Sequence, residues 1–272
     1  MTKIKLIAID LDGTLLNDET QVPQANIAAI EQVIKQGYRI VICTGRTLQG
    51  AKRFIEQLNI EAGQEEYTIF QNGALTYRLP EYECIQVFTL NAKAKQAGLA
   101  FVRKHQLELV AFDTEHFYVV DNPEPTHLVK DDAETLAMDM VFVSEEEFLA
   151  NDRINKLTFI APEAKLDQAQ AAGIASLEEY GNPVRSQPWL IELLPQAVNK
   201  GVALKALAAK LGFEASEVMA IGDQLNDYEM LEWAEHSVAM GQAVEPIQKL
   251  ARYQTKSNNE AGVAYALANF IN

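Results

Sequence analysis

The sequence predicts an α/β protein, with a doubly wound parallel sheet interrupted by an inserted α+β domain. Three observations predict this class. Short, nearly continuous apolar segments alternate with helical patterns, several of them end in polar turns, and this rhythm stops mid-chain and later resumes. Continuous apolar strands are typical of parallel sheets buried on both faces. Strands that alternate with helices across short turns favour doubly wound topology.

The N-terminal part carries the alternation in its clearest form. We expect a buried strand over 4–9, a helix that begins near Pro23 and ends before Gly37, a strand over 39–43, a helix over 47–58 and a strand over 67–70. The three strands run into Asp10-Leu11-Asp12-Gly13-Thr14, Thr44-Gly45-Arg46 and Asn72-Gly73.

The middle of the chain lacks such strand-ending turns. It predicts a hairpin around Pro80 with strands near 75–77 and 84–88, a helix over 91–105, strands over 107–112 and 117–120, helix or loop to 149, a strand over 155–160, a helix over 163–180 and a strand over 183–186. This part is predicted to be a separate α+β unit.

After Trp189 the first pattern resumes. We expect a strand over 190–194, a helix from Lys200 to Gly212, a strand over 218–221, a helix over 227–233, a strand over 237–240, and helices over 244–251 and 260–271. The predicted domains are therefore a core made of 1–83 and 189–272 and an inserted cap of 84–188.

Charge and composition limit the partners. The 272 residues include 23 Lys and Arg against 38 Asp and Glu, which gives a formal charge of −15. Such an acidic surface repels nucleic acid and anionic lipid. Two cysteines predict neither a disulfide framework nor a Cys-rich zinc site, and no apolar run reaches membrane-spanning length. We expect a cytoplasmic protein that binds neither nucleic acid nor membrane.

Polar residues follow the outer strands at one predicted edge of the sheet. Ligands of open parallel sheets bind beyond the carboxyl ends of the strands, so these side chains should converge. They are Asp10, Asp12, Thr44, Lys200, Asp223, Asn226 and Asp227. Clustered carboxylates without histidine indicate a hard cation, and Mg²⁺ is the expected cofactor.

This set suits phosphoryl transfer. Ionised Asp10 could attack phosphorus to give an aspartyl phosphate. Asp12 could protonate the leaving oxygen and then deprotonate the attacking water. Backbone N–H groups after the turn at Gly13, together with Thr44, Gly45 and Lys200, could hold the phosphate oxygens.

The motifs closely resemble those of the haloacid dehalogenase superfamily of phosphatases. They are Asp10-Leu11-Asp12-Gly13-Thr14-Leu15, Thr44-Gly45-Arg46, Lys200 and Gly222-Asp223-x-x-Asn226-Asp227, in that order along nearly the whole chain. The Asn72-Gly73-Ala74 turn and the insertion between the Thr44 and Lys200 motifs resemble the Cof-type sugar-phosphatase branch.

The resemblance implies a Rossmann-like core, a C2-type cap that selects the substrate, and Mg²⁺-dependent hydrolysis of small phosphate monoesters. Sugar phosphates are the expected substrates, and flavin or pyridoxal phosphates stay open. It implies that Asp10 is the nucleophile and a metal ligand, that Asp12 binds metal through its carbonyl and is the general acid/base, and that Asp223 is the third metal ligand. The implied phosphate-binding groups are Leu11 N–H, Thr44, Gly45, Lys200 and Asn226. Asp227 is implied to contact the metal ligands rather than the metal itself.

Two other functions stay open. A phosphotransferase or mutase would pass the phosphoryl group from Asp10 to a sugar hydroxyl, and a metabolite-binding module would use the same site without catalysis. Asp227 could equally cap the first turn of its helix or add negative charge there. Arg46 is expected to be an ion-pair partner. No motif in 84–188 names the substrate, and no pattern sets the oligomeric state.

Overall fold

The structure, a computed structural model, describes residues 3–60, 66–196 and 198–271. The chain divides into two compact units. The first unit combines Met1–Ile85 with Asn199–Asn272, and the second unit is Gln86–Val198.

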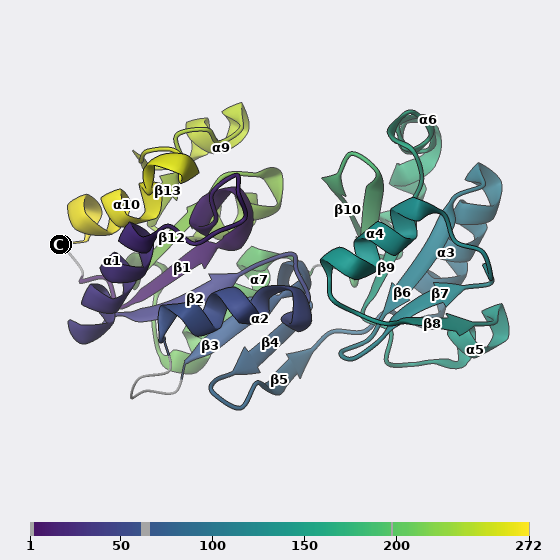
Figure 1. The fold of residues 1–272 in the computed structure, drawn as a ribbon, viewed down its shortest axis with the longest axis horizontal. Coiled ribbons are helices and arrows are strands. Elements are labelled where there is room, and N and C mark those ends of the chain that lie inside the picture. The colour runs from purple at the N-terminus through teal and green to yellow at the C-terminus, as the bar shows by residue number, and fades with distance from the viewer. Residues whose placement is uncertain (1–2, 61–65, 197, 272) are drawn as a thin grey trace. The chain divides into compact units, whose positions relative to one another are not determined.

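The first unit is built on an eight-stranded sheet in the order β14-β13-β12-β1-β2-β3-β4-β5 (Figure 1). The pairs from β14 to β3 are parallel, and β4 runs antiparallel to β3. This confirms the α/β class. The strands are β1 (Leu6–Asp10), β2 (Arg39–Cys43), β3 (Tyr67–Phe70), β4 (Leu75–Arg78), β5 (Glu83–Val87), β12 (Val218–Gly222), β13 (His236–Ala239) and β14 (Tyr253–Gln254).

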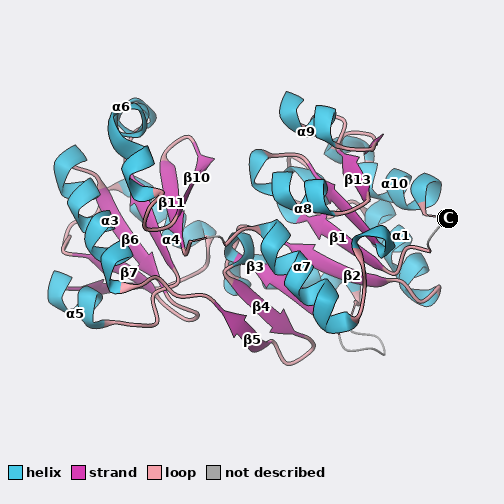
Figure 2. Ribbon diagram, turned by 180° about the vertical axis from the view of Figure 1, so that it is seen from behind, coloured by secondary structure: helices cyan, strands magenta, loops and turns pink. Residues whose placement is uncertain are grey.

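Helices cover both faces of this sheet. Figure 1 shows α1 (Gln24–Lys35), α2 (Leu48–Ile55) and α10 (Gly262–Phe270) on one face, and Figure 2 shows α7 (Lys200–Leu211) and α8 (Tyr228–Trp233) on the other. The short α9 (Glu245–Leu250) follows β13. α7 has clear sequence boundaries: the side chain of Asn199 accepts a hydrogen bond from Val202 N–H, and Gly212 ends the helix in the left-handed region.

The strands of this sheet are buried because helices lie on both sides. All five residues of β1 and of β12 are buried, and their register pairs Ile9 with Ile221. The two carboxyl ends therefore lie side by side. The turn Leu11–Leu15 leaves β1 at this edge.

The second unit is a six-stranded sheet in the order β10-β11-β9-β6-β7-β8. Its strands are β6 (Glu108–Phe112), β7 (Phe117–Val120), β8 (Met140–Val143), β9 (Lys156–Ile160), β10 (Asn182–Gln187) and β11 (Leu190–Leu194). Its helices are α3 (Ala92–His105), α4 (His127–Thr135), α5 (Glu145–Ala150) and α6 (Glu163–Gly173).

Alternation along these strands gives the second unit two apolar cores. Leu157 and Phe159 of β9 pack with residues of α3, α5 and α6, whereas Ile160 packs with Val129 and Ala133 of α4. A strand of period two supplies both faces, so this sheet has α4 on one side and the other three helices opposite.

Two strands differ from the predicted domain division. Leu190–Leu194, predicted to belong to the core sheet, is β11 and pairs antiparallel with β9 and β10 of the second unit. The prediction was wrong because an apolar run followed by a helix start fits either sheet, and its partners are not visible in its own residues. At the other crossing, β5 begins before residue 84 and neighbours β4 in the first sheet.

Two further strands had no clear sequence pattern. β8 lies where helix or loop was expected, because its four residues follow acidic helical sequence and none of them is fully buried. β14 has two residues at the edge of the first sheet. Among the described residues, no helix combines the length and apolar character needed to cross a bilayer.

Candidate active site

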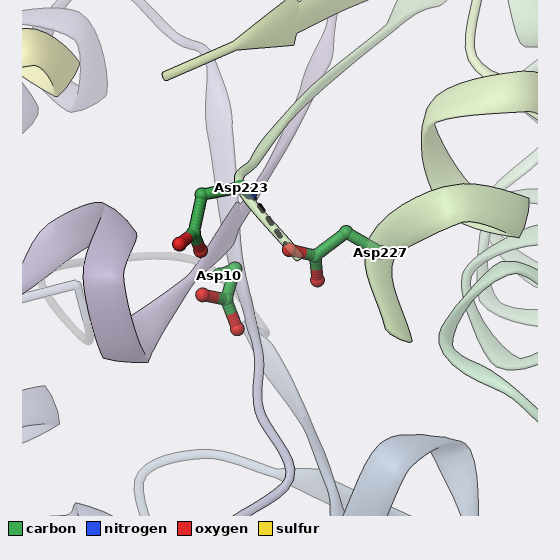
Figure 3. Close-up of side chains that lie close together, drawn as sticks. All are labelled: Asp10, Asp223 and Asp227. Atoms are coloured by element: carbon green, nitrogen blue, oxygen red, sulfur yellow. Dashed lines mark hydrogen bonds between the residues drawn. The ribbon is translucent and has the colours of Figure 1, made fainter. Parts of the chain in front are cut away.

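Three aspartates converge at the carboxyl edge of the first sheet. Asp10 is the last residue of β1, Asp223 follows β12, and Asp227 precedes α8. One carboxylate oxygen from each lies within 4.8 Å of the others, and all three side chains are buried (Figure 3). The neighbouring register of β1 and β12 places the ends of these strands side by side, and all three aspartates are among the residues that the sequence placed at this edge.

Lys200 neutralises part of this charge. Its Nζ donates to Oδ1 of Asp10 and to Oδ1 of Asp227, each at 2.6 Å, and the Lys200 side chain is fully buried. Burial disfavours the ammonium form, yet the two carboxylates hold the pKa of Lys200 above its ordinary value. Lys200 is therefore a fixed positive charge in the site.

Asp227 is fully engaged by the protein. Besides the Lys200 contact on Oδ1, its Oδ2 accepts hydrogen bonds from the N–H groups of Asp223, at 2.9 Å (dashed in Figure 3), and Gln224, at 3.1 Å. Gly222 leaves room for it, since a Cβ there would lie 2.6 Å from Asp227 Oδ2. Asp227 thus fixes both Lys200 and the turn that carries Asp223.

Asp223 is held from the opposite side. Thr14 Oγ1 donates to its Oδ1 at 3.1 Å, and the side chain of Gln242 also hydrogen-bonds to it. Burial, followed by the charge of Asp227, raises the pKa of Asp223 to about 7. Gly13 has φ +75°, and a Cβ there would lie 2.5 Å from Asp223 Oδ2, so this turn requires glycine.

Asp10 retains an oxygen for chemistry. Burial, and then the charge of Asp227, raises the pKa of Asp10 well above its ordinary value. Its Oδ1 accepts from Lys200, whereas no donor in the described part of the chain reaches its Oδ2. Three buried carboxylates face one ammonium, so a bound divalent cation would relieve the excess negative charge. An all-oxygen donor set fits a hard cation such as Mg²⁺.

The predicted phosphate-binding residues lie on turns that are hydrogen-bonded together. Thr44 is buried after β2, and its Oγ1 accepts from Arg46 N–H at 3.1 Å. Asn226 donates through Nδ2 to Oδ1 of Asn72 at 3.0 Å. A Cβ on Gly45 would lie 3.1 Å from the side-chain N and O of Asn72. Asn72 therefore joins the turns after β2, β3 and β12.

The carboxylate of Asp12 lies outside the aspartate cluster. Its side chain is 51% exposed and forms an ion pair with Arg46, with a shortest N–O distance of 2.6 Å. Leu11, whose N–H was predicted to bind phosphate, is fully buried in the same turn. The structure thus brings together Asp10, Asp223, Asp227 and Lys200, and leaves the Asp12 carboxylate at the surface.

Sequence reasoning missed three supporting residues. Thr14 and Gln242 hold Asp223, and Asn72 contacts Asn226. Thr14 lies within the first motif, and Asn72 follows β3 at the same edge of the sheet. Gln242 is three residues beyond β13, so extending the strand-end argument to β13 would have found it.

Comparison with known proteins identifies the family. The family model for haloacid dehalogenase-like hydrolases matches residues 7–267. The chain belongs to this family. It is 32% identical over 294 residues to the phosphatase YwpJ of Bacillus subtilis, with 98% of this chain and 100% of the relative covered.

The names of two further relatives indicate what they act on. The 5-amino-6-(5-phospho-D-ribitylamino)uracil phosphatase YcsE of Bacillus subtilis is 31% identical over 268 residues, covering 98% of this chain and 96% of the relative. The solved structure of the HAD subclass IIB sugar phosphatase BT4131 has a TM-score of 0.81 and 25% identity, and covers 98% of both chains. The predicted family is confirmed, and the chain is a haloacid dehalogenase-type phosphatase.

Proposed function

We propose that this protein is a Mg²⁺-dependent phosphatase that hydrolyses small phosphate monoesters, sugar or polyol phosphates first among them, through a phospho-Asp10 intermediate. The observation that carries the proposal is the difference between the two carboxylate oxygens of Asp10. One oxygen is fixed by Lys200, the other accepts no hydrogen bond in the described residues, and the side chain ends the central strand of the sheet.

The chain's residues have distinct tasks in this proposal. Asp10 Oδ2 attacks phosphorus, the P–O bond to the leaving alcohol breaks, and the carboxyl–phosphate bond forms. Asp12 gives its proton to the leaving oxygen and then takes one from the water that attacks phospho-Asp10. Lys200 stabilises the negative phosphoryl oxygens, and the Thr44 hydroxyl and Asn226 are the further donors.

Asp10, Asp223 and the carbonyl of Asp12 are the proposed Mg²⁺ ligands. The bound ion would supply positive charge to the phosphoryl oxygens. Asp227 is assigned a supporting role instead, because its carboxylate is completely buried and accepts three hydrogen bonds, from Lys200 and from two backbone N–H groups. Its task is to hold Lys200 and the Asp223 turn in place.

The substrate class rests on relatives. One acts on a phosphorylated ribityl compound and another is a sugar phosphatase, and both align along nearly the whole chain. We assign substrate selection to the second unit, which follows from its place as an insertion between the Thr44 and Lys200 turns of the first.

The test is phosphate release by wild-type protein and by Asp10→Asn, with Mg²⁺, across a panel of sugar, polyol and aryl phosphates. Wild-type protein should release inorganic phosphate and lose the activity on chelation by EDTA. Asp10→Asn should lose turnover, whereas Asp139→Asn, at an exposed position in the second unit, should keep it. Full activity of Asp10→Asn would overturn the mechanism, and transfer between sugar positions without phosphate release would indicate a mutase.

A further inference from the structure

Arg46 makes a two-oxygen contact with the carboxylate of Asp12. Its Nε donates to Oδ1 at 3.1 Å and to Oδ2 at 2.9 Å, and its Nη2 donates to Oδ1 at 2.6 Å. A planar guanidinium that spans both carboxylate oxygens fixes the direction of the carboxylate as well as its distance.

Arg46 is itself anchored at several points. Its Nη1 donates to the carbonyl of Gly50 at 3.1 Å, and its guanidinium lies over the ring of Phe54, 5.2 Å from the centroid. Its backbone N–H donates to Thr44 Oγ1, and its carbonyl accepts from Gln71 N–H at 3.0 Å. The Arg46 side chain is only 16% exposed, against 51% for Asp12. The arginine is therefore the rigid partner of the pair.

The location of Asp12 makes this contact consequential. Asp12 is two residues from Asp10, beside a cluster of three carboxylates whose excess charge favours a cation. A free carboxylate this close would be attracted to the same cation. Arg46 offers it a permanent positive partner on the other side, and its bidentate geometry selects one orientation.

We propose that Arg46 is the positioning residue of the general acid/base: it keeps the Asp12 carboxylate at the rim of the site and out of the Asp10–Asp223–Asp227 cluster. Asp12 Oδ2 accepts a single hydrogen bond from Arg46, so it keeps a lone pair for the proton that passes to the leaving oxygen. This inference rests on the proposed function. In this role Arg46 contacts neither phosphorus nor Asp10 and acts only through Asp12.

The role predicts losses that depend on the leaving group. Phenyl phosphate leaves as a strongly basic phenolate and needs a proton, whereas p-nitrophenyl phosphate leaves as a much weaker base and does not. General acid catalysis contributes about 10²–10⁴-fold. For Arg46→Met, kcat/KM for phenyl phosphate should fall about 10²-fold, because misplacement of a catalytic group by about 1 Å costs that much. Since p-nitrophenyl phosphate does not need the proton, its kcat/KM should fall less than about threefold.

Arg53 supplies a matched control. Its guanidinium also lies over Phe54, at 4.6 Å from the centroid, and its side chain is exposed. Arg53→Met should change neither rate. Arg46→Lys keeps the charge but cannot span both oxygens, so its loss on phenyl phosphate should lie between those of wild type and Arg46→Met.

A double variant tests whether Arg46 acts through Asp12. If it does, Arg46→Met in an Asp12→Ala background should cost nothing more on phenyl phosphate. With rates normalised to the amount of folded protein, equal losses of Arg46→Met on the two esters would overturn the inference. Losses that multiply in the double variant would overturn it as well. Because both esters are measured on one protein, a loss of folded protein would lower both rates equally and leave their ratio at the wild-type value. If Asp10→Asn instead hydrolysed both esters at the wild-type rate, the proposed function would fail, whatever the ratio of the two rates in Arg46→Met.

Discussion

The ammonium nitrogen of Lys200 lies 2.6 Å from Oδ1 of Asp227, and both side chains are completely shielded from solvent. Lys200 lies at the same distance from Asp10. The lysine thus ties the strand that carries the proposed nucleophile to the turn that carries Asp223, and its charge serves the fold as well as the chemistry.

Replacement of Lys200 by Met should therefore affect both. Without the ammonium, three buried carboxylates face one another with no positive partner, and the removal of one member of a buried ion pair costs about 3–5 kcal/mol. We expect a lower urea midpoint in EDTA and a loss of phosphatase rate of at least about 10²-fold. Lys205→Met, at an exposed position on the same helix, should change neither measurement.

The raised pKa of Asp223 predicts how stability depends on pH without metal. Its ordinary value is 3.8 and its folded value is about 7, so the folded protein binds this proton more tightly than the unfolded chain. Its contribution is present below pH 4 and is lost as pH rises from about 4 to 7. In EDTA the melting temperature should fall across this window, and Asp223→Asn should flatten the slope.

Mg²⁺ should reverse that loss at neutral pH. A ligand at 100 times its Kd stabilises the folded state by about 2.7 kcal/mol. Thermal melts at pH 7.5 with and without Mg²⁺ should differ for wild-type protein and coincide for Asp223→Asn. A wild-type melt insensitive to millimolar Mg²⁺ would contradict the assignment of a cation to the aspartate cluster.

Gly13 and Gly37 separate backbone strain from damage to the site. Both have positive φ, +75° and +88°, so alanine at either should cost about 1–2 kcal/mol. At Gly13 the new Cβ would also strike Asp223, whereas at Gly37 no atom lies within 4 Å. Gly13→Ala should lose most of its activity, and Gly37→Ala should lose stability alone. Equal activity in the two variants would refute the packing argument.

A buried ion pair in the second unit gives a prediction independent of the chemistry. Lys156 Nζ donates to Glu192 Oε1 at 2.7 Å between β9 and β11, and lies 4.3 Å from the centre of the Phe112 ring. Lys156→Met should destabilise the protein by about 3 kcal/mol, because Glu192 stays buried without its main cation. The double change Lys156→Met, Glu192→Leu should recover most of this in urea unfolding, and no recovery would mean that the pair itself is required.

Much of the site could be predicted because strand ends are visible in sequence. An apolar run that stops at Asp10 or before Asp223 marks a carboxyl end, and parallel neighbours bring such ends together. This pattern does not show which residue each side chain pairs with. The separation of the Asp12 carboxylate from the cluster depends on Arg46, which is 34 positions away and reaches it only because β2 lies beside β1.

The fold shows the same division. Buried strands such as β1, β2 and β3 could be located within a residue or two from their apolar runs. Membership of a sheet could not, because β11 has the apolar run of a core strand yet pairs with β9 and β10. Pairing is decided by residues far along the chain, and a local pattern contains no record of them.

The position of β1 between β12 and β2 also sets the order in which the site can be assembled during synthesis. One neighbour, β2, emerges from the ribosome soon after β1, whereas β12 begins at residue 218, after the whole second unit. At a synthesis rate of about 5–20 residues per second, Lys200 and Asp223 are added to the chain about 10 s or more after Asp10. Until then the nascent β1 has an open edge, and closing that edge is the event that completes the site.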